Sequence, residues 1–473
     1  MSEKMYRETT TPMIEKAPAE KRMQIAAVTS VSLGTFCAGT VLCWTSPALS
    51  HIETPTAINS TTPGFTVTPS EGALIASTLT LGALLSAIPA GYFADKFGRK
   101  PVILSLAAMF LLNWIMITFA RSLTVVLVAR LFAGIGLGGI CVVAPIYIGE
   151  ISEASHRGFF GSFLQLGLAG GVFYTCLVGN FAGWAGLGAA LAATPVLLGA
   201  TFAFMPESPV YLIGKGRRKR AERNLRALRG PLYDIAEEVR AAEENAAAAA
   251  AKERVGVAAL FTSRANARAL TSAVGVLVCQ QFSGINVIVF YTVAIFQAAE
   301  TDLSPFVSAL IVNAVQWASS VIPMVTIERA NRRLFLMASS LGMMACLVGL
   351  GVFFHLKLIV IDAASRFGYL PLTSTVLFMV FFCIGYGPIP WMLLGELFSP
   401  EIKGFAGGIS ILVNWTSAFV VTFAFPLIKQ AYGMHVAFYI LGGIMGAATL
   451  FVCFVVPETR GKTLNQIQEE LNR

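Results

Sequence analysis

The chain has 473 residues, of which 56% are hydrophobic and only 13% are charged. A soluble domain carries roughly a quarter charged residues, so the composition excludes an ordinary soluble protein and indicates a membrane protein. No Ser-His-Asp or Cys-His arrangement and no metal-ligand spacing is present, and the four His do not cluster along the chain. We therefore expect no enzyme, no metal site and no cofactor.

Apolar residues come in blocks, and a block of about 20 such residues crosses a bilayer as one helix. The first block follows a polar start, so we expect no cleavable signal peptide. About twelve blocks can be read from the sequence, near 25–49, 72–93, 102–120, 123–149, 159–181, 185–205, 268–298, 304–327, 334–354, 373–395, 405–428 and 435–456. All eight Cys lie within these blocks, which predicts free, buried thiols.

The net charge of +8 is a topology signal rather than a sign of nucleic-acid binding. Twelve spans place both termini on one side, and that side carries 29 of the 34 Lys and Arg residues. Because positively charged loops stay cytoplasmic, both termini are predicted to be cytoplasmic. We expect a multi-pass protein of the cell membrane whose partners are the lipid bilayer and a small molecule, with no nucleic acid and no required oligomer.

Two hydrophilic segments stand out. The predicted outer loop 50–71 carries the sequon Asn59-Ser60-Thr61, a candidate glycosylation site, whereas a second sequon at Asn414 falls inside a span and should be inaccessible. The segment 206–267 divides the spans six and six and is rich in Ala, Arg and Glu, which are strong helix formers. We expect short cytoplasmic helices there; the alternative is a disordered basic linker.

Three charged phrases occur twice, in the same order. GYFADKFGRK (91–100), GEISEASHRG (149–158) and PESP (206–209) are followed by IERANRR (327–333), GELFSPEIKG (395–404) and PETRG (457–461). Each set follows the second, fourth and sixth span of its own half, which indicates two related six-helix halves. The predicted divisions are a tail at 1–24, a bundle at 25–205, a helical linker at 206–267, a bundle at 268–456 and a tail at 457–473.

The repeated phrases alternate acids and bases at the cytoplasmic ends of spans. Single charges there anchor a helix in the headgroups, but an alternating set can form ion pairs that hold helices together and can still break. We predict two networks of gate charges, made from Asp95, Arg99, Glu150, Arg157, Glu207, Glu328, Arg332, Arg333, Glu396, Lys403 and Glu458.

In combination these motifs resemble the sugar porter family of the major facilitator superfamily. The resemblance covers nearly the whole chain after residue 25 and includes PIYIGEISEASHRG, PESPVYL, QQFSGINVIVFYT (280–292), GPIPW (387–391) and PETRGKT. SPAL (46–49) and NWTSAFVVT (414–422) look most like the insect facilitated trehalose transporters, followed by animal glucose facilitators. Two departures are Asn331, where the loop motif usually has Gly, and Ala418, where several hexose facilitators have Asn.

The resemblance implies an all-α fold of twelve transmembrane helices with a midplane site between the halves. Amide side chains suit a sugar because they donate and accept hydrogen bonds, although they also join helices. A break near Ser283-Gly284 is needed to make Gln281 and Asn286 converge. The predicted substrate-binding residues are Gln165, Gln280, Gln281, Asn286, Gln316, Trp391 and Asn414, with Asn313 and Arg130 as further candidates.

Facilitated diffusion of a sugar, with trehalose as the leading substrate, is the function that the resemblance implies. Proton-coupled or facilitative hexose transport is the alternative within the same fold, and a non-transporting sugar sensor is an alternative from another class. Proton coupling usually needs an intramembrane acid, and no predicted span has Asp or Glu in its interior. A helix-1 Asp commonly fills that role in the family, and Thr40 occupies the aligned position here.

Overall fold

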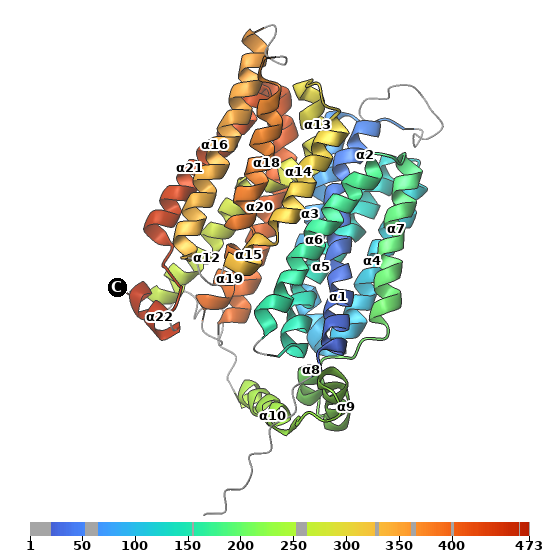
Figure 1. Ribbon diagram of the computed structural model, residues 1–473, viewed down its shortest axis with the longest axis vertical. Helices are drawn as coiled ribbons and strands as arrows, with labels where there is room; N and C mark the ends of the chain where they lie inside the picture. Colours follow the sequence, from blue (N-terminus) through green and yellow to red (C-terminus); the bar gives the residue numbers. More distant parts are fainter. Residues whose placement is uncertain are drawn as a thin grey trace, which may run out of the picture.

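The structure is a computed structural model of the whole chain, shown in Figure 1. It describes residues 20–52, 65–153, 156–251, 263–326, 331–360, 366–398, 402–462 and 464–472. The described residues fold into helices, as the apolar blocks predict. The first half consists of α1 (Arg22–Cys43), α2 (Thr45–Ile52), α3 (Pro69–Phe97), α4 (Arg99–Thr118), α5 (Leu123–Ile151), α6 (Arg157–Gly179) and α7 (Trp184–Phe202).

The second half repeats this plan with more interruptions. It consists of α12 (Arg264–Phe282), α13 (Ile285–Ala299), α14 (Pro305–Ser319), α15 (Ile322–Thr326), α16 (Arg332–Ile359), α18 (Tyr369–Ile384), α19 (Ile389–Glu396), α20 (Lys403–Tyr432) and α21 (Met434–Val455). In the described part of the chain, eleven helical spans are long and apolar enough to cross a membrane, and α14 is a shorter twelfth. The predicted all-α, twelve-helix class is therefore confirmed.

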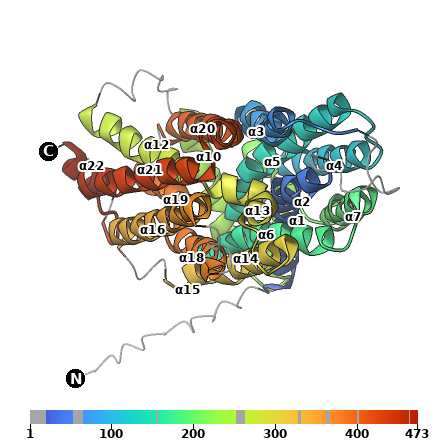
Figure 2. The same ribbon diagram turned by 90° about the horizontal axis from the view of Figure 1, so that it is seen from above.

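Seen from above, the two halves lie side by side, and α20 of the second half runs along α3 of the first (Figure 2). The linker forms α8 (Pro209–Gly214), α9 (Arg218–Arg229) and α10 (Ala236–Ala251), which lie beneath one end of the bundle (Figure 1). That end is named the linker end, and the opposite end, where α2 and α13 lie, is named the far end. The last helix, α22 (Leu464–Asn472), follows the second half. The helical reading of the linker is confirmed.

Small residues let helices within a half approach closely. A Cβ atom at Gly134 of α5 would lie 2.1 Å from the main-chain oxygen of Leu79 in α3, so only glycine fits there. Close backbone packing of this kind replaces the hydrophobic driving force that lipid cannot supply.

Hydrogen bonds between the halves lie toward the far end and the middle. The main-chain N–H of Val293 donates to Ser46 Oγ at 3.1 Å, and Asn313 Nδ2 donates to Cys176 Sγ at 3.0 Å. Close to Cys176 and Asn313 along the chain, the rings of Phe173 and Trp317 also stack across the two halves, with centroids 5.7 Å apart. The charged contacts described at the linker end instead stay within one half.

Candidate functional site

The seventh span breaks at the predicted place. Helix α12 ends at Phe282 and α13 begins at Ile285, and Gly284 between them has φ of 83°, in the left-handed region that favours glycine. A side chain at Gly284 would also meet Leu441, because a Cβ atom there would lie 2.8 Å from Leu441 Cδ1. Glycine is therefore required at this break.

The break brings four predicted amides into one hydrogen-bonded chain. Asn286 Nδ2 donates to Gln281 Oε1 at 2.6 Å, and Gln281 Nε2 donates to Asn414 Oδ1 at 3.1 Å. Asn414 Nδ2 in turn donates to Gln280 Oε1 at 3.3 Å. The chain joins α12, α13 and α20 and is named the amide network. Asn286 is half-buried, whereas the other three amides are buried.

A second helix break anchors the amide network. The tenth span is interrupted between α18 and α19, at Gly385-Tyr386-Gly387-Pro388, which frees main-chain carbonyls. Gln280 Nε2 donates to the carbonyl oxygen of Tyr386 at 2.6 Å. Tyr386 is not among the residues predicted from the sequence, although the Gly-X-Gly-Pro pattern around it is a signal for such a break.

The remaining predicted amides lie on other helices. Asn313 and Gln316 in α14 are buried, and the side-chain oxygen of each has no hydrogen-bond partner among the described residues. Gln165 in α6 is half-buried, and Trp391 in α19 is 39% exposed. In the described part of the chain, no hydrogen bond joins Gln165 or Trp391 to the amide network. The structure thus unites four of the seven leading candidates.

Arg130 lies apart from the amide network, in the part of α5 that is nearer the far end of the first half. Its guanidinium is fully buried and donates to the carbonyl oxygens of Val41 at 2.7 Å and Ile75 at 3.3 Å. It also donates to Thr45 Oγ1 at 2.9 Å and lies over the Trp44 ring, 5.2 Å from the centroid. These contacts join α5 to α3 and to the break between α1 and α2, so they are contacts of helix packing.

The first charged network lies at the linker end of the first half. Arg99 makes a two-point ion pair with Glu150, at 2.8 Å from Nε and 2.7 Å from Nη2, and it also pairs with Asp95 at 3.1 Å. Glu207 accepts hydrogen bonds from the main-chain N–H groups of Arg99, Lys100 and Ser208. Burial raises the pKa of Glu207 above its ordinary value, although these amides and Arg99 oppose that shift.

The second charged network repeats the first. Arg332 Nη2 lies 3.2 Å from Glu396 Oε1, and Thr459 Oγ1 donates to Glu396 Oε2 at 2.6 Å. Glu458 accepts from the main-chain N–H groups of Arg332 and Arg333, each at 3.1 Å. Glu207 and Glu458 thus occupy the same place in their halves, at the N-terminus of the third and ninth spans.

Some predicted residues lie outside what the structure describes. Glu328 and Asn59 are not among the described residues, and the side chains of Arg157 and Lys403 are not described either. The second sequon is inaccessible to glycosylation, as predicted, because Asn414 is fully buried within the bundle.

The four His do not cluster along the chain, but two of them lie close together in the structure. Helix α16 continues to Ile359 and keeps His355 beside α21. The rings of His355 and His435 lie 5.1 Å apart. The described residues contain no group of three or more His, Cys, Asp or Glu that could hold a metal ion. The eight Cys are free, as expected, but only five are buried, and Cys141, Cys279 and Cys453 are half-buried.

Comparisons with known proteins agree with this architecture. The family model described as "Sugar (and other) transporter" matches residues 18–471. The facilitated trehalose transporter Tret1 of Polypedilum vanderplanki is 33% identical over 467 residues, which cover 99% of this chain and 90% of that protein. The Tret1 of Drosophila yakuba is 34% identical over 467 residues, but the chain spans only 53% of its length.

Solved structures share the fold. The inward-open xylose transporter XylE from E. coli superposes with a TM-score of 0.77 at 21% identity, over 94% of this chain and 99% of that one. The proton:xylose symporter XylE bound to 6-bromo-6-deoxy-D-glucose gives a TM-score of 0.74 at 22% identity, over 95% and 99%. With its two six-helix halves and a family match over nearly its whole length, the chain is a multi-pass membrane protein that belongs to the family described as sugar (and other) transporters.

Proposed function

We propose that the chain carries trehalose across the cell membrane by facilitated diffusion. The amide network is the observation that carries this proposal, since it offers paired donors and acceptors at two helix breaks inside an apolar bundle. The names of the insect relatives support trehalose as the substrate. The substrate is carried and released unchanged, as in the rest of the family.

The sugar exchanges its hydrogen bonds with water for bonds to amides. Gln281 and Asn286 can rearrange when the sugar arrives, because each bonds to another amide rather than to a rigid main chain. The unpartnered oxygens of Asn313 and Gln316 suit sugar hydroxyls as donors. The exposed ring of Trp391 offers an apolar face to the sugar ring. Gln165, Gln280 and Asn414 complete the proposed site.

Access alternates as the halves rock about this site. We assign the linker end to the cytoplasm, with both termini, and the loop that contains Asn59 to the outside, because the basic residues concentrate at the linker end. The two charged networks act as latches that stiffen the helix ends of each half. Labelling of single Cys introduced at residues 60 and 245 in intact cells tests this orientation; modification at 245 but not at 60 would reverse it.

Proton-coupled hexose uptake is the competing function, and the proton:xylose symporter XylE shares the fold. In this chain Thr40 is buried, and its hydroxyl donates to the carbonyl oxygen of Cys37 at 2.7 Å. A threonine hydroxyl does not titrate in the physiological range, so this position supplies no proton carrier.

Uptake of labelled trehalose and labelled glucose into cells that express the chain tests the proposed substrate. We expect saturable trehalose uptake that unlabelled trehalose inhibits more strongly than glucose does. Glucose uptake with no trehalose uptake would assign a hexose transporter. Surface expression with no uptake of either sugar would favour the sensor.

A further inference from the structure

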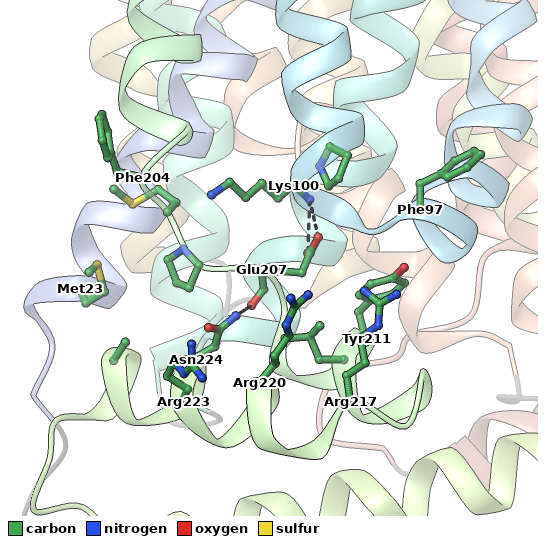
Figure 3. A pocket seen from close by; sticks show the side chains of 15 residues that line it. Met23, Phe97, Lys100, Phe204, Glu207, Tyr211, Arg217, Arg220, Arg223 and Asn224 are labelled. Carbon is green, nitrogen blue, oxygen red and sulfur yellow. Dashed lines mark hydrogen bonds between the residues drawn. The ribbon is translucent and has the colours of Figure 1, made fainter.

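A cavity of about 580 Å³ lies at the linker end of the first half, away from the amide network (Figure 3). Its walls come from the ends of α3 and α4, from the chain that follows α7, and from α8 and α9. Its volume falls within the range of small-molecule sites, roughly 300–1,000 Å³. The proposed sugar path does not use it.

The cavity is strongly cationic. Lys100, Arg217, Arg220 and Arg223 line it against one carboxylate, that of Glu207. Arg220 and Arg223 are three residues apart on α9 and therefore share one helix face. The neighbouring side chain of Asn224 donates to the main-chain oxygen of Glu207 at 2.9 Å, which holds that face against the bundle. Figure 3 shows Arg220 rising from α9 toward Glu207.

The positive charge of these four lining cations is not neutralised by carboxylates of the protein. Both oxygens of Glu207 already accept main-chain N–H groups, at 2.8–3.3 Å. Two other arginines of α9 are paired with carboxylates: Arg218 lies 2.9 Å from both Glu222 and Glu243, and Arg229 lies 3.0 Å from Glu238. Among the described residues, no carboxylate lies within 4.0 Å of a side-chain nitrogen of the four lining cations. The cavity is therefore suited to an external anion.

Apolar side chains mark the position of the cavity relative to the bilayer. Phe204, just beyond the end of the spanning helix α7, is 82% exposed, and Phe97 at the end of α3 is 56% exposed. Both line the cavity. Exposed apolar rings at the ends of spanning helices are buried at the boundary between the headgroups and the acyl chains. The ligand thus meets cations on one side and apolar surface on the other.

We propose that this cavity binds the phosphorylated headgroup of an anionic phospholipid in the leaflet at the linker end. Arginine forks bind phosphate oxygens in pairs, and Lys100 adds a point charge. Basic residues next to spans attract the anionic lipids of the cytoplasmic leaflet, so the proposal rests on the orientation proposed above. A soluble phosphate compound shares the same chemistry, but it gives no role to the exposed Phe97 and Phe204.

Lipid binding to the full-length chain in neutral detergent tests the proposal, with native mass spectrometry as the readout. The probes are dioctanoyl phosphatidylinositol 4,5-bisphosphate, the soluble inositol 1,4,5-trisphosphate, and dioctanoyl phosphatidylcholine. We expect tight binding of the anionic lipid, weaker binding of the soluble phosphate and none of the neutral lipid. Binding of the soluble phosphate as tight as that of the lipid would overturn the lipid assignment, as would equal binding of both lipids.

Two matched double variants locate the site. Arg220→Ala with Arg223→Ala removes two lining cations, and we expect about 30-fold weaker lipid binding, the fold-change for two basic residues at an anionic membrane surface. Lys219→Ala with Arg226→Ala removes the same charge from exposed positions of α9 outside the cavity, and binding should stay close to that of the wild type. Equal losses in both pairs, with unchanged melting temperatures, would overturn the site. Phe204→Ala should weaken lipid binding but leave inositol trisphosphate binding unchanged.

Discussion

The two halves share a plan at the linker end. In each half a carboxylate from the segment after the last span, Glu207 or Glu458, accepts the first main-chain N–H groups of a helix that begins with Arg99 or Arg332. The N-terminal amides of a helix lack partners within it and favour negative charge. The repeated phrases therefore encode a helix cap as well as an ion pair.

The two networks differ in tightness. Gly98 turns the first one with φ of 110°, whereas Asn331 at the equivalent place has φ of −69° and accepts a hydrogen bond from Arg460. A Cβ atom at Gly98 would lie 2.3 Å from Glu207 Oε2, so the first network closes more tightly around its turn. Asparagine is tolerated at position 331 because the backbone there is extended and does not need the positive φ found at Gly98.

The membrane-embedded parts of the two halves differ more. The first half contains the fully buried Arg130, whose hydrogen-bond partners all lie in its own half. The second half carries the amide network, and three of its spans are interrupted, between α12 and α13, between α14 and α15, and between α18 and α19. A fully buried cation with fixed partners suits a rigid support. Interrupted helices whose amides can exchange hydrogen-bond partners suit a site that must bind and release a sugar. Substitutions should therefore affect stability at Arg130 and transport at the amide network.

Loss of Arg130 should have the largest effect, on stability. Arg130→Leu leaves the oxygens of Val41, Ile75 and Thr45 without this donor, and we expect a loss of about 3 kcal/mol in the free energy of unfolding. Thermal unfolding of the purified protein measures it. Thr45→Val, which removes one acceptor, should cost about 1 kcal/mol. A wild-type melting temperature for Arg130→Leu would contradict the supporting role.

Loss of Gln281 should affect transport rather than folding. Gln281→Leu removes the link between Asn286 and Asn414, and two lost hydrogen bonds correspond to about 30-fold slower sugar uptake at low concentration. Gln24→Leu is the matched control, because Gln24 is a fully buried glutamine in α1 with neither amide atom bonded in the described structure. Equal uptake by the two variants at equal surface expression would remove the amide network from the sugar site.

The charged networks should have smaller effects. Glu150→Gln should slow net cycling more than Glu396→Gln, because Glu150 makes the two-point pair and its side chain is 15% exposed against 28% for Glu396. We expect shifts of about 1–2 kcal/mol between conformational states, typical of such coupling. Accessibility of a single Cys placed in the sugar site reports the shift from the linker side.

A charge pair at the far end provides the control for these variants. Glu300 lies 2.9 Å from Lys357 but is 73% exposed, so Glu300→Gln should leave both cycling and accessibility unchanged. Equal effects of Glu300→Gln and Glu150→Gln would show that the charged networks do not control the balance between conformational states.

Local patterns predicted the spans, the repeat and the break at Ser283-Gly284, because apolar runs and a glycine act over a few residues. They could not predict which amides meet, since Gln280 and Asn414 lie 134 residues apart in sequence, on different helices. The partners of Arg130 are mainly main-chain carbonyls, which leave no mark in the sequence. The contact of His355 with His435 depends on how far α16 extends. The cationic cavity depends on where the linker helices α8 and α9 pack against the bundle.

The steady-state level of trehalose inside proteoliposomes tests facilitated diffusion most directly. The purified chain is reconstituted, labelled trehalose is supplied outside, and an inward proton gradient is imposed or collapsed with a protonophore. Because no described span has an acid in its interior, internal trehalose should rise to the external concentration and stop there, with or without the gradient. Accumulation several-fold above the external concentration, abolished by the protonophore, would contradict facilitated diffusion and require a proton carrier in the chain.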